Sequence, residues 1–216
     1  MKDFKDKSLL DLALTHRSWV NEHKGVRPSN ERLEFLGDAV LEFVVSKELF
    51  TKFPDKEEGY LTALRASLVN TVSLAEVAKK LDLGSLLNLS KGEEESGGRT
   101  NPSLLADTVE AIIGAIFIDR GISDAEKFIA ENLLIETEKR ASAPLKDPKS
   151  LLQEYVQSQS LSAPKYQVAS ETGPDHNKNF IVEVVISGEV WGKGEGKSKS
   201  LAEQEAARNA LDSHVA

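Results

Sequence analysis

The chain has 216 residues, 40% hydrophobic and 29% charged, which is typical of one medium globular domain or two small ones. It contains no cysteine, which excludes disulfides and thiolate metal sites and suits the reducing cytoplasm where we expect it. We find no secretory signal and no apolar run near the roughly 18 residues of a membrane span, so we expect no membrane partner. The net charge of −8 argues against a nucleic-acid partner, because phosphate binding depends mostly on Lys and Arg.

Apolar residues recur at helical spacing through the first two thirds of the chain, where alternating strand patterns are absent. This spacing predicts helices at residues 7–20, 30–53, 57–80, 102–119 and 122–140. The stretch 91–102 contains glycines, acids and a proline, so we predict a loop there, with the three glutamates at 93–95 in solvent. We therefore expect an all-α domain over residues 1–142.

The pattern changes after ASAPLKDPK, whose small residues and two prolines indicate a linker, placed at residues 143–148. An amphipathic helix at 150–159 precedes strand-like segments at 165–170, 179–187 and 189–194, and a second helix at 200–214. Ser200 and Glu203 fit a capping box at the start of this last helix. The pattern predicts a small α+β domain of α-β-β-β-α type over residues 149–216, which can fold alone.

Three acids lie on one edge of the predicted helix that begins NERLEFLGDAV. At about 100° per residue, Glu31, Glu34 and Asp38 fall within about 60° of one another, opposite an apolar side. Taken alone, such an edge is most simply a solvated helix surface.

A second acid pair changes that interpretation. In NPSLLADTVEAIIGAIFID, Asp107 and Glu110 share a face of a helix that is apolar almost all round, which predicts burial, and Gly114 would permit close helix packing. Buried carboxylates are costly unless they are paired or bind metal. Two interpretations stay open: ion pairs with arginines, or convergence of both acid pairs on a hard divalent cation. The available arginines are Arg32, Arg65 and Arg99.

The ligand types narrow the choice of metal. A di-iron site in a helical bundle usually needs Glu-x-x-His, and neither acid pair has a histidine at that offset. An all-oxygen site favours Mg²⁺, with Mn²⁺ as a plausible substitute, and phosphate chemistry.

NERLEFLGDAV resembles the signature of the ribonuclease III family, and the match extends to LTHRSW, GYLTALRASLVN and LLADTVEAIIGAIFID. The resemblance covers nearly the whole chain, in the family's domain order. It implies a divalent-metal-dependent endoribonuclease that hydrolyses double-stranded RNA. The implied products have 5′-phosphate and 3′-hydroxyl ends with short 3′ overhangs, and the implied roles are in ribosomal RNA precursor and messenger RNA processing.

The same resemblance implies roles for particular residues. Two residues, Glu31 and Phe35, match positions that the family uses largely at its dimer interface. Because one such domain cuts one strand, and this chain has one, a homodimer through the catalytic domain is implied. Asp38 and Glu110 are the implied catalytic acids. The implied metal ligands are Glu34, Asp38, Asp107 and Glu110.

The C-terminal domain resembles a double-stranded RNA-binding domain, with SLLQEYVQ as its first helix, GPDHNKNF as a loop and GKGEGKSKSLAEQEAA leading into its last helix. Polar side chains of the first helix and loop would read the minor groove, and cations at a helix N-terminus would bind phosphates. The predicted RNA contacts are Gln153, Glu154, His176, Lys178, Lys197, Lys199 and Ser200.

Charge weakens this prediction. The family usually has two adjacent cations where this chain has Lys199 followed by Ser200. Residues 147–216 contain seven Lys or Arg against ten Asp or Glu, a net charge of −3. Binding must therefore rest on a local group, and we predict modest affinity with a shallow dependence on salt. That group is Lys178, Lys193, Lys197 and Lys199.

Other interpretations remain to be compared with the structure. The chain could bind duplex RNA without cutting it, although retention of all four acids argues against this. GKGEGKSKS superficially resembles a phosphate-binding loop, but the motif requires glycine where Trp191 stands. His16 has no nearby acid motif in the sequence, so we expect a packed or capping residue.

Overall fold

The computed structural model describes residues 4–142, 145, 147–174 and 178–214. The chain divides into an N-terminal unit, Met1–Leu145, and a C-terminal unit, Lys146–Ala216. Each unit has its own hydrophobic core. The described ranges hold no helix with the length and apolar content needed to cross a membrane.

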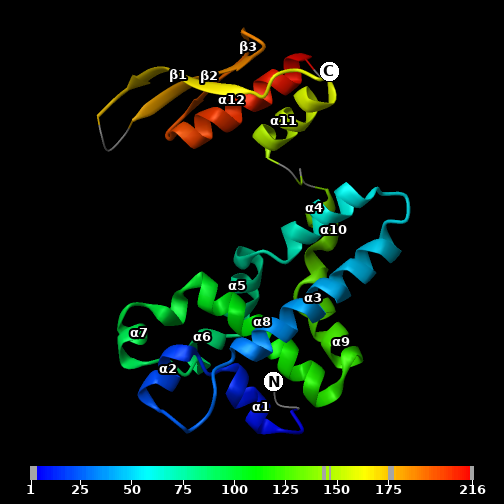
Figure 1. Cartoon of the computed structure of the whole chain (residues 1–216), viewed down its shortest axis with the longest axis vertical. Helices are drawn as coiled ribbons and strands as arrows, with labels where there is room; N and C mark the ends of the chain where they lie inside the picture. The colour runs from blue at the N-terminus through cyan, green and yellow to red at the C-terminus, as the bar shows by residue number, and fades with distance from the viewer. Residues whose placement is uncertain (1–3, 143–144, 146, 175–177, 215–216) are drawn as a thin grey trace. The chain divides into compact units, whose positions relative to one another are not determined.

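The described part of the N-terminal unit is helical, as predicted. Its elements are α1 (Lys7–Ala13), α2 (Arg17–Glu22), α3 (Glu31–Lys52), α4 (Glu58–Leu68), α5 (Thr71–Lys80), α6 (Leu83–Leu86), α7 (Lys91–Glu95), η1 (Gly98–Thr100), α8 (Pro102–Arg120), α9 (Ile122–Asn132), η2 (Leu134–Glu136) and α10 (Thr137–Ala141). Helix α8 begins shortly after η1 and runs through the centre of the unit beside α3 (Figure 1).

Two glycines let α3 and α8 pack with their backbones in contact. A Cβ atom at Gly37 would lie 1.8 Å from the backbone oxygen of Glu110, and one at Gly114 would lie 2.2 Å from the backbone oxygen of Leu33. Neither neighbour can move, because both are backbone atoms inside helices. Glycine at both positions therefore sets the separation of the two helices that carry the acids.

Three predicted helices are interrupted in the structure. Residues 7–20 form α1 and α2, because the His16 ring accepts a hydrogen bond from the Ser18 amide and caps α2. Residues 57–80 form α4 and α5, because the Asn70 side chain accepts from the Ser73 amide and starts a new helix. Residues 122–140 form α9, η2 and most of α10.

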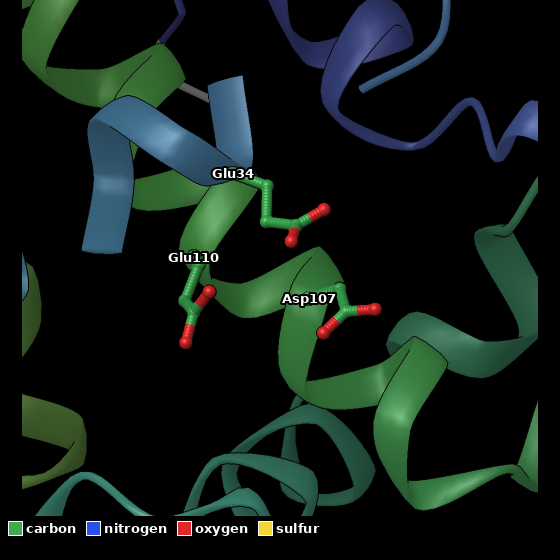
Figure 2. A group of neighbouring side chains, drawn as sticks. All are labelled: Glu34, Asp107 and Glu110. Atoms are coloured by element: carbon green, nitrogen blue, oxygen red, sulfur yellow. The ribbon is translucent and has the colours of Figure 1, made fainter. Parts of the chain in front are cut away.

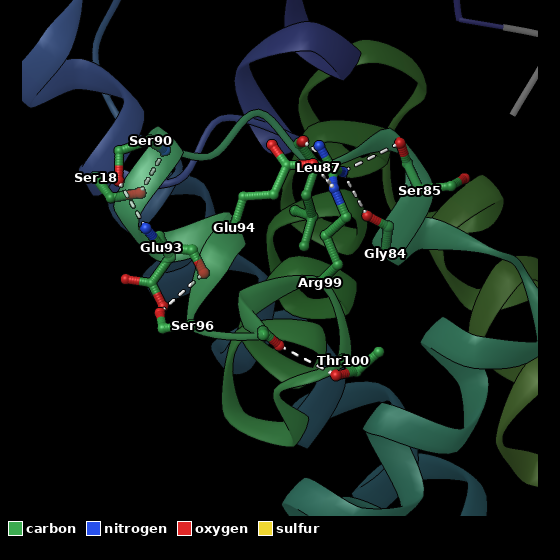
Figure 3. Close-up of polar contacts among 11 residues, drawn as sticks. Ser18, Gly84, Ser85, Leu87, Ser90, Glu93, Glu94, Ser96, Arg99 and Thr100 are labelled. Atoms are coloured by element: carbon green, nitrogen blue, oxygen red, sulfur yellow. Dashed lines mark hydrogen bonds and ion pairs between the residues drawn. The ribbon is translucent and has the colours of Figure 1, made fainter.

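The predicted loop at 91–102 was wrong, since it contains α7, η1 and the first residue of α8. Ser90 caps α7 by accepting from the Glu93 amide. The Arg99 guanidinium donates to the backbone oxygens of Gly84, Ser85 and Leu87, which terminate α6. It also pairs with Glu94 at 2.7 Å, so one side chain ties three short helices together (Figure 3).

The C-terminal unit confirms the predicted α-β-β-β-α order. It consists of α11 (Pro148–Ser158), β1 (Lys165–Thr172), β2 (Asn179–Ile186), β3 (Glu189–Gly196) and α12 (Lys199–His214). The strands form one antiparallel sheet in the order β1-β2-β3. Alternate residues of β2, from Phe180 to Ile186, are buried, and both helices lie on that face of the sheet (Figure 1).

The predicted capping box of α12 was wrong by two residues. The helix begins at Lys199, and the Ser198 hydroxyl accepts from the Leu201 amide at 3.2 Å, which makes Ser198 the cap. The carboxylate of Glu203 instead pairs with Lys149 of α11. Ser200 is thus left exposed in the first turn of the helix.

Candidate metal centre and nucleic-acid interface

Three carboxylates from two helices meet in the N-terminal unit. Glu34 projects from α3, and Asp107 and Glu110 project from α8 (Figure 2). One carboxylate oxygen from each lies within 4.8 Å of the others. All three residues are half-buried, so the cluster is open on one side. Oxygen donors at this spacing suit a hard divalent cation.

The pKa values of these carboxyl groups are all raised. Burial, together with the negative charges of Asp38, Asp107 and Glu34, raises the pKa of Glu110 to about 7. Burial and the nearby Asp107 carboxylate also raise the pKa of Glu34. Burial raises the pKa of Asp107, although His16 opposes this shift. The groups therefore repel one another, and a bound cation would relieve that repulsion.

The arginine interpretation of the acids is not supported. The Arg65 side chain pairs with Glu42 at 2.7 Å, and Arg99 pairs with Glu94. Within the described ranges, no Lys or Arg forms an ion pair with Glu34, Asp107 or Glu110. The donor set is thus all-oxygen and without a protein counter-ion, and it fits a divalent cation.

The fourth predicted ligand, Asp38, lies outside the group of three. It is exposed on α3, one turn after Glu34. Its charge still acts on both Glu110 and Glu34, because it contributes to the raised pKa of each. Asp38 therefore lies at the open, solvent-facing edge of the cluster.

Buried hydrogen bonds hold the start of α3 in place. The side chain of Asn30, a residue only 4% exposed, donates to the Ala13 backbone oxygen at 3.1 Å. The Asn30 backbone amide donates to the Thr15 backbone oxygen at 2.9 Å. Asn88 joins the same node through its hydrogen bonds with residues 14–16. This node fixes the first turn of α3, and with it Glu34, against the segment that leads into α2.

His16 caps α2, as expected, but it also belongs to the surroundings of the cluster. Its Nδ1 atom bonds with the Ser18 hydroxyl at 2.8 Å, and Ser18 in turn accepts from the Ser90 amide at 3.0 Å (Figure 3 shows the Ser18–Ser90 part). The ring is close enough to Asp107 to lower the pKa of that carboxyl. Since 91 positions separate the two residues, no sequence pattern could have indicated this proximity.

The two predicted dimer residues are both on the surface. Phe35 is 80% exposed, an unusual position for an aromatic side chain next to a buried helix face. The Glu31 carboxylate accepts from the Ser29 hydroxyl at 2.6 Å and lies 3.7 Å from Arg17. Both side chains point away from the unit's own core and are available to another surface.

The predicted RNA contacts in the C-terminal unit lie at separate places. Gln153 and Glu154 are exposed on α11. Lys197, Lys199 and Ser200 are exposed where β3 leads into α12, with the Lys199 ammonium 5.7 Å from the centre of the Phe180 ring. The seventh predicted contact, His176, lies outside the described residues.

Two lysines of the local group form ion pairs with acids. Lys178 pairs with Glu171 at 2.6 Å. Lys193 pairs with Glu183 at 2.7 Å, and Gln167 donates to the same carboxylate, so the three residues form a row across β1, β2 and β3. Because Glu183 alternates with the buried residues of β2, this row lies on the sheet face opposite the helices. Lys193 thus lies on the opposite sheet face from Phe180, whose ring the Lys199 ammonium approaches.

Comparison with known proteins adds sequence-wide support to this geometry. A family model described as Ribonuclease-III-like matches residues 6–137, and a double-stranded RNA binding motif matches residues 148–214. The first match covers more than half of the chain and includes all four acids. The chain belongs to the ribonuclease III family.

Individual proteins agree with this assignment. Ribonuclease 3 of Natranaerobius thermophilus is 47% identical over 208 residues, which cover 96% of this chain and 90% of that protein. Ribonuclease 3 of Streptococcus pneumoniae is 46% identical over 211 residues, covering 97% and 91%. The solved nuclease domain of ribonuclease III from Campylobacter jejuni is 48% identical, with a TM-score of 0.55, and the match covers 60% of this chain and 90% of that domain.

The ribonuclease III assignment explains why the cluster has no counter-ion of its own. Enzymes of this family require a divalent metal, and Glu34, Asp107 and Glu110 form the acidic cluster that could hold it. Gly37 was missed by the sequence analysis, although it lies in the signature motif three residues after Glu34. A glycine on the inner face of a long helix indicates a close helix contact, and here that contact is with the backbone of Glu110 itself.

Proposed function

We propose that this chain is a double-strand-specific endoribonuclease whose reaction depends on Mg²⁺ held by the acidic cluster, with Mn²⁺ as a possible substitute. The convergence of Glu34, Asp107 and Glu110 within 4.8 Å, without a protein cation, carries this proposal. The family match supplies the substrate class. The products would carry 5′-phosphate and 3′-hydroxyl ends with short 3′ overhangs, from ribosomal RNA precursors and messenger RNA in the cytoplasm.

The acids have different proposed roles. Glu34, Asp107 and Glu110 would hold the metal, and Asp38 would complete the set at the solvent-facing edge, beside the incoming phosphodiester. Asp38 and Glu110 are the proposed catalytic acids, since the charge of the first bears directly on the second. Bound there, a divalent cation would screen the phosphate oxygens and lower the pKa of a coordinated water that serves as nucleophile.

The charge of the site explains why the acids cannot act alone. Four carboxylates would repel a phosphodiester, and burial together with their mutual repulsion already raises the pKa of Glu110 to about 7. His16 would help to position the Asp107 side chain, because Ser18 holds its ring where it lowers the pKa of that carboxyl.

We also propose a homodimer through the N-terminal unit. The Campylobacter jejuni nuclease domain has a region involved in dimer formation. In this chain, the 80% exposed Phe35 on α3, beside Glu31, is the apolar side chain best suited to such a contact. Two copies would supply the two cutting sites needed for both strands of a duplex.

RNA recognition is proposed for the C-terminal unit through exposed polar side chains of α11 and the start of α12. The amides at the first turn of α12 are oriented to attract phosphate, next to Lys197 and Lys199. The proposed contact residues are Gln153, Glu154, His176, Lys178, Lys197, Lys199 and Ser200.

The test compares three samples on long duplex RNA: the wild type with Mg²⁺, the wild type with chelator, and Glu110→Gln with Mg²⁺. We expect short duplexes from the first, and binding without cleavage from the other two. Glu48→Gln is the matched control, because Glu48 is exposed on α3 and lies outside the cluster. Equal cleavage by Glu110→Gln and Glu48→Gln would remove the proposed metal site, whereas binding without cleavage by the wild type would favour a non-cleaving binder.

A further inference from the structure

A short basic segment stands out in this acidic chain. Residues 17–27 contain three cations, Arg17, Lys24 and Arg27, against one acid, Glu22, although the whole chain carries a net charge of −8. The Glu22 carboxylate is already used, since it accepts from the Lys91 amide at 3.2 Å. The segment comprises α2 and the turn that leads to α3.

Aromatic stacking gives this segment a defined surface. The rings of Trp19 and His23 are stacked with centroids 4.0 Å apart and planes 8° from parallel. The Arg27 guanidinium carbon lies 5.2 Å from the centre of the Trp19 ring. We call Trp19, His23, Lys24 and Arg27 the basic aromatic cluster. Because the rings hold the polar groups in place, binding an anion here would cost little side-chain ordering.

The charges of the cluster remain available to a partner. The ion pair of Arg27 with Asp11 is 3.7 Å long and partly exposed, and such pairs contribute little free energy. Lys24 is exposed and forms no ion pair within the described ranges. Arg17 is not included, because it faces Glu31.

The basic aromatic cluster begins on α2 with Trp19 and continues past the end of that helix, whose N-cap, His16, is near the acidic cluster. His16, at the beginning of α2, is close enough to Asp107 to change the pKa of that carboxyl. A helix rises about 1.5 Å per residue, so His23 lies roughly 10 Å farther along α2. A nucleic-acid strand carries one phosphate per about 3.4 Å of duplex axis, so this span corresponds to a few nucleotides.

Among its described residues, the C-terminal unit has few unpaired cations with which to bind RNA phosphates. Residues 147–216 carry a net charge of −3, from seven cations and ten acids, and Lys149, Lys178 and Lys193 are ion-paired with glutamates. Duplex RNA is bound largely through its phosphates, so cations elsewhere in the chain would have to contribute.

We propose that the basic aromatic cluster binds backbone phosphates of duplex RNA a few nucleotides from the bond that is cut. Lys24 and Arg27 supply the positive charges, and the stacked rings of Trp19 and His23 hold the Arg27 side chain beside the RNA backbone phosphates. This inference rests on the proposed function and assigns the N-terminal unit a part in gripping the substrate, separate from its metal site.

The test measures duplex RNA binding by the full chain in chelator, so that nothing is cut, at several salt concentrations. Each lost phosphate contact should lower the slope of log affinity against log salt by about 0.9, so Lys24→Gln/Arg27→Gln should lose about two. In Mg²⁺ the same variant should show a raised KM and an unchanged kcat. Lys79→Gln/Lys80→Gln, which removes two exposed lysines of α5, is the matched control and should keep the wild-type slope.

Lys24→Gln alone guards against a folding defect, because this side chain is exposed; it should lose about one unit of slope. Equal slopes for the wild type, both Lys24 variants and the control would overturn the proposal. So would a lower kcat with an unchanged slope, which would mean that the cluster acts on the metal site. If the wild type binds but never cuts, the proposed function fails, while a reduced slope in the variants would still support the phosphate contact.

Discussion

Three acids of the N-terminal unit and three acids of the C-terminal unit lie in opposite electrostatic surroundings. In the described part of the N-terminal unit, Glu34, Asp107 and Glu110 meet without a Lys or Arg partner; burial raises the pKa of all three, and neighbouring carboxylates also raise those of Glu34 and Glu110. In the C-terminal unit, acids are neutralised by lysines, and hydrogen bonds from Lys193 and Gln167 lower the pKa of Glu183. The ion pairs there join Lys149 to Glu203, Lys178 to Glu171 and Lys193 to Glu183.

This difference separates a site from a scaffold. An acid with a lysine partner stabilises the fold slightly and is satisfied within the chain. Half-buried acids that repel one another destabilise the fold, so the fold must hold them together by other means. Here those means are the two glycines at the crossing of α3 and α8, which press the helices together where the acids project.

The largest expected effect comes from filling that crossing. In Gly37→Ala the new Cβ would meet the Glu110 backbone oxygen, so the helices must separate, at a cost of about 3 kcal/mol or more. We expect cleavage to be lost while the C-terminal unit still binds RNA. The counterpart is Gly194→Ala, whose Cβ would lie 2.1 Å from the Ala206 amide nitrogen, between β3 and α12. It should weaken RNA binding and leave metal binding by the N-terminal unit intact.

The two tryptophans let these effects be assigned to one unit or the other. The chain has two, Trp19 in α2 and Trp191 in β3, so Trp19→Phe and Trp191→Phe backgrounds each report on one unit by fluorescence during unfolding. Gly37→Ala should shift only the transition seen by Trp19, and Gly194→Ala only that seen by Trp191. A shift of both transitions by either variant would show that the units do not unfold separately.

The next prediction is that removing an acid changes stability in opposite directions in the two units. Asp107→Asn should lower kcat by about 10²–10³-fold, because a ligand is lost from the cation that would stabilise the transition state. It should also stabilise the metal-free protein, since it relieves burial of a charge and repulsion within the cluster. Glu183→Gln should leave kcat unchanged and slightly destabilise the C-terminal unit, by less than about 1 kcal/mol. Cleavage assays and thermal unfolding in chelator measure both; the same sign of stability change in the two variants would remove the contrast.

The sequence predicted the fold class and the family, but it did not predict every helix boundary. Periodicity joined α1 to α2 and α4 to α5, because apolar spacing continues across His16 and Asn70, whose side chains start new helices. Asn is a preferred N-cap, so that break could have been predicted, whereas a histidine cap has no such signal. The capping box at Ser200 failed because Ser198 fits the same role two residues earlier.

Prediction of the site had a different limit. Helical spacing correctly placed Glu34 and Asp38 on one edge of the helix. It does not give the distance from each carboxylate to the second helix, so it could not show that Asp38 stays outside the group of three. Nor can spacing within one helix measure the separation between two. That separation depends on contacts between α3 and α8 at Gly37 and Gly114, which lie far apart in the chain.

A smaller effect is expected from pH. In chelator, the pKa of Glu110 is about 7 in the folded protein, above its ordinary value of 4.5. Unfolding at a pH between these two values therefore releases a proton from this group. Stability should therefore be highest below about pH 4.5 as far as this group is concerned, and fall as pH rises towards 7. With allowance for solvent screening, we expect roughly 1 kcal/mol, or about 2–4 °C in Tm. Thermal unfolding at pH 5 and 8 should show this fall in the wild type and not in Glu110→Gln; Mg²⁺ should restore the wild-type Tm at pH 8.

The smallest effect tests the weakly charged RNA surface of the C-terminal unit. Ser200 is exposed in the first turn of α12, where the amides attract phosphate and Lys199 is its neighbour. Ser200→Lys should add one phosphate contact, steepen the salt slope of RNA binding by about 0.9 and so change affinity about three- to fourfold over a fourfold range of salt. A cation at a helix N-terminus also costs about 0.3–1 kcal/mol of stability, so Tm should fall slightly while affinity rises. Ser213→Lys, exposed in the last turn of the same helix, should leave the slope unchanged. If both lysines steepened it equally, RNA binding would depend on the net charge of the unit and not on the first turn of α12.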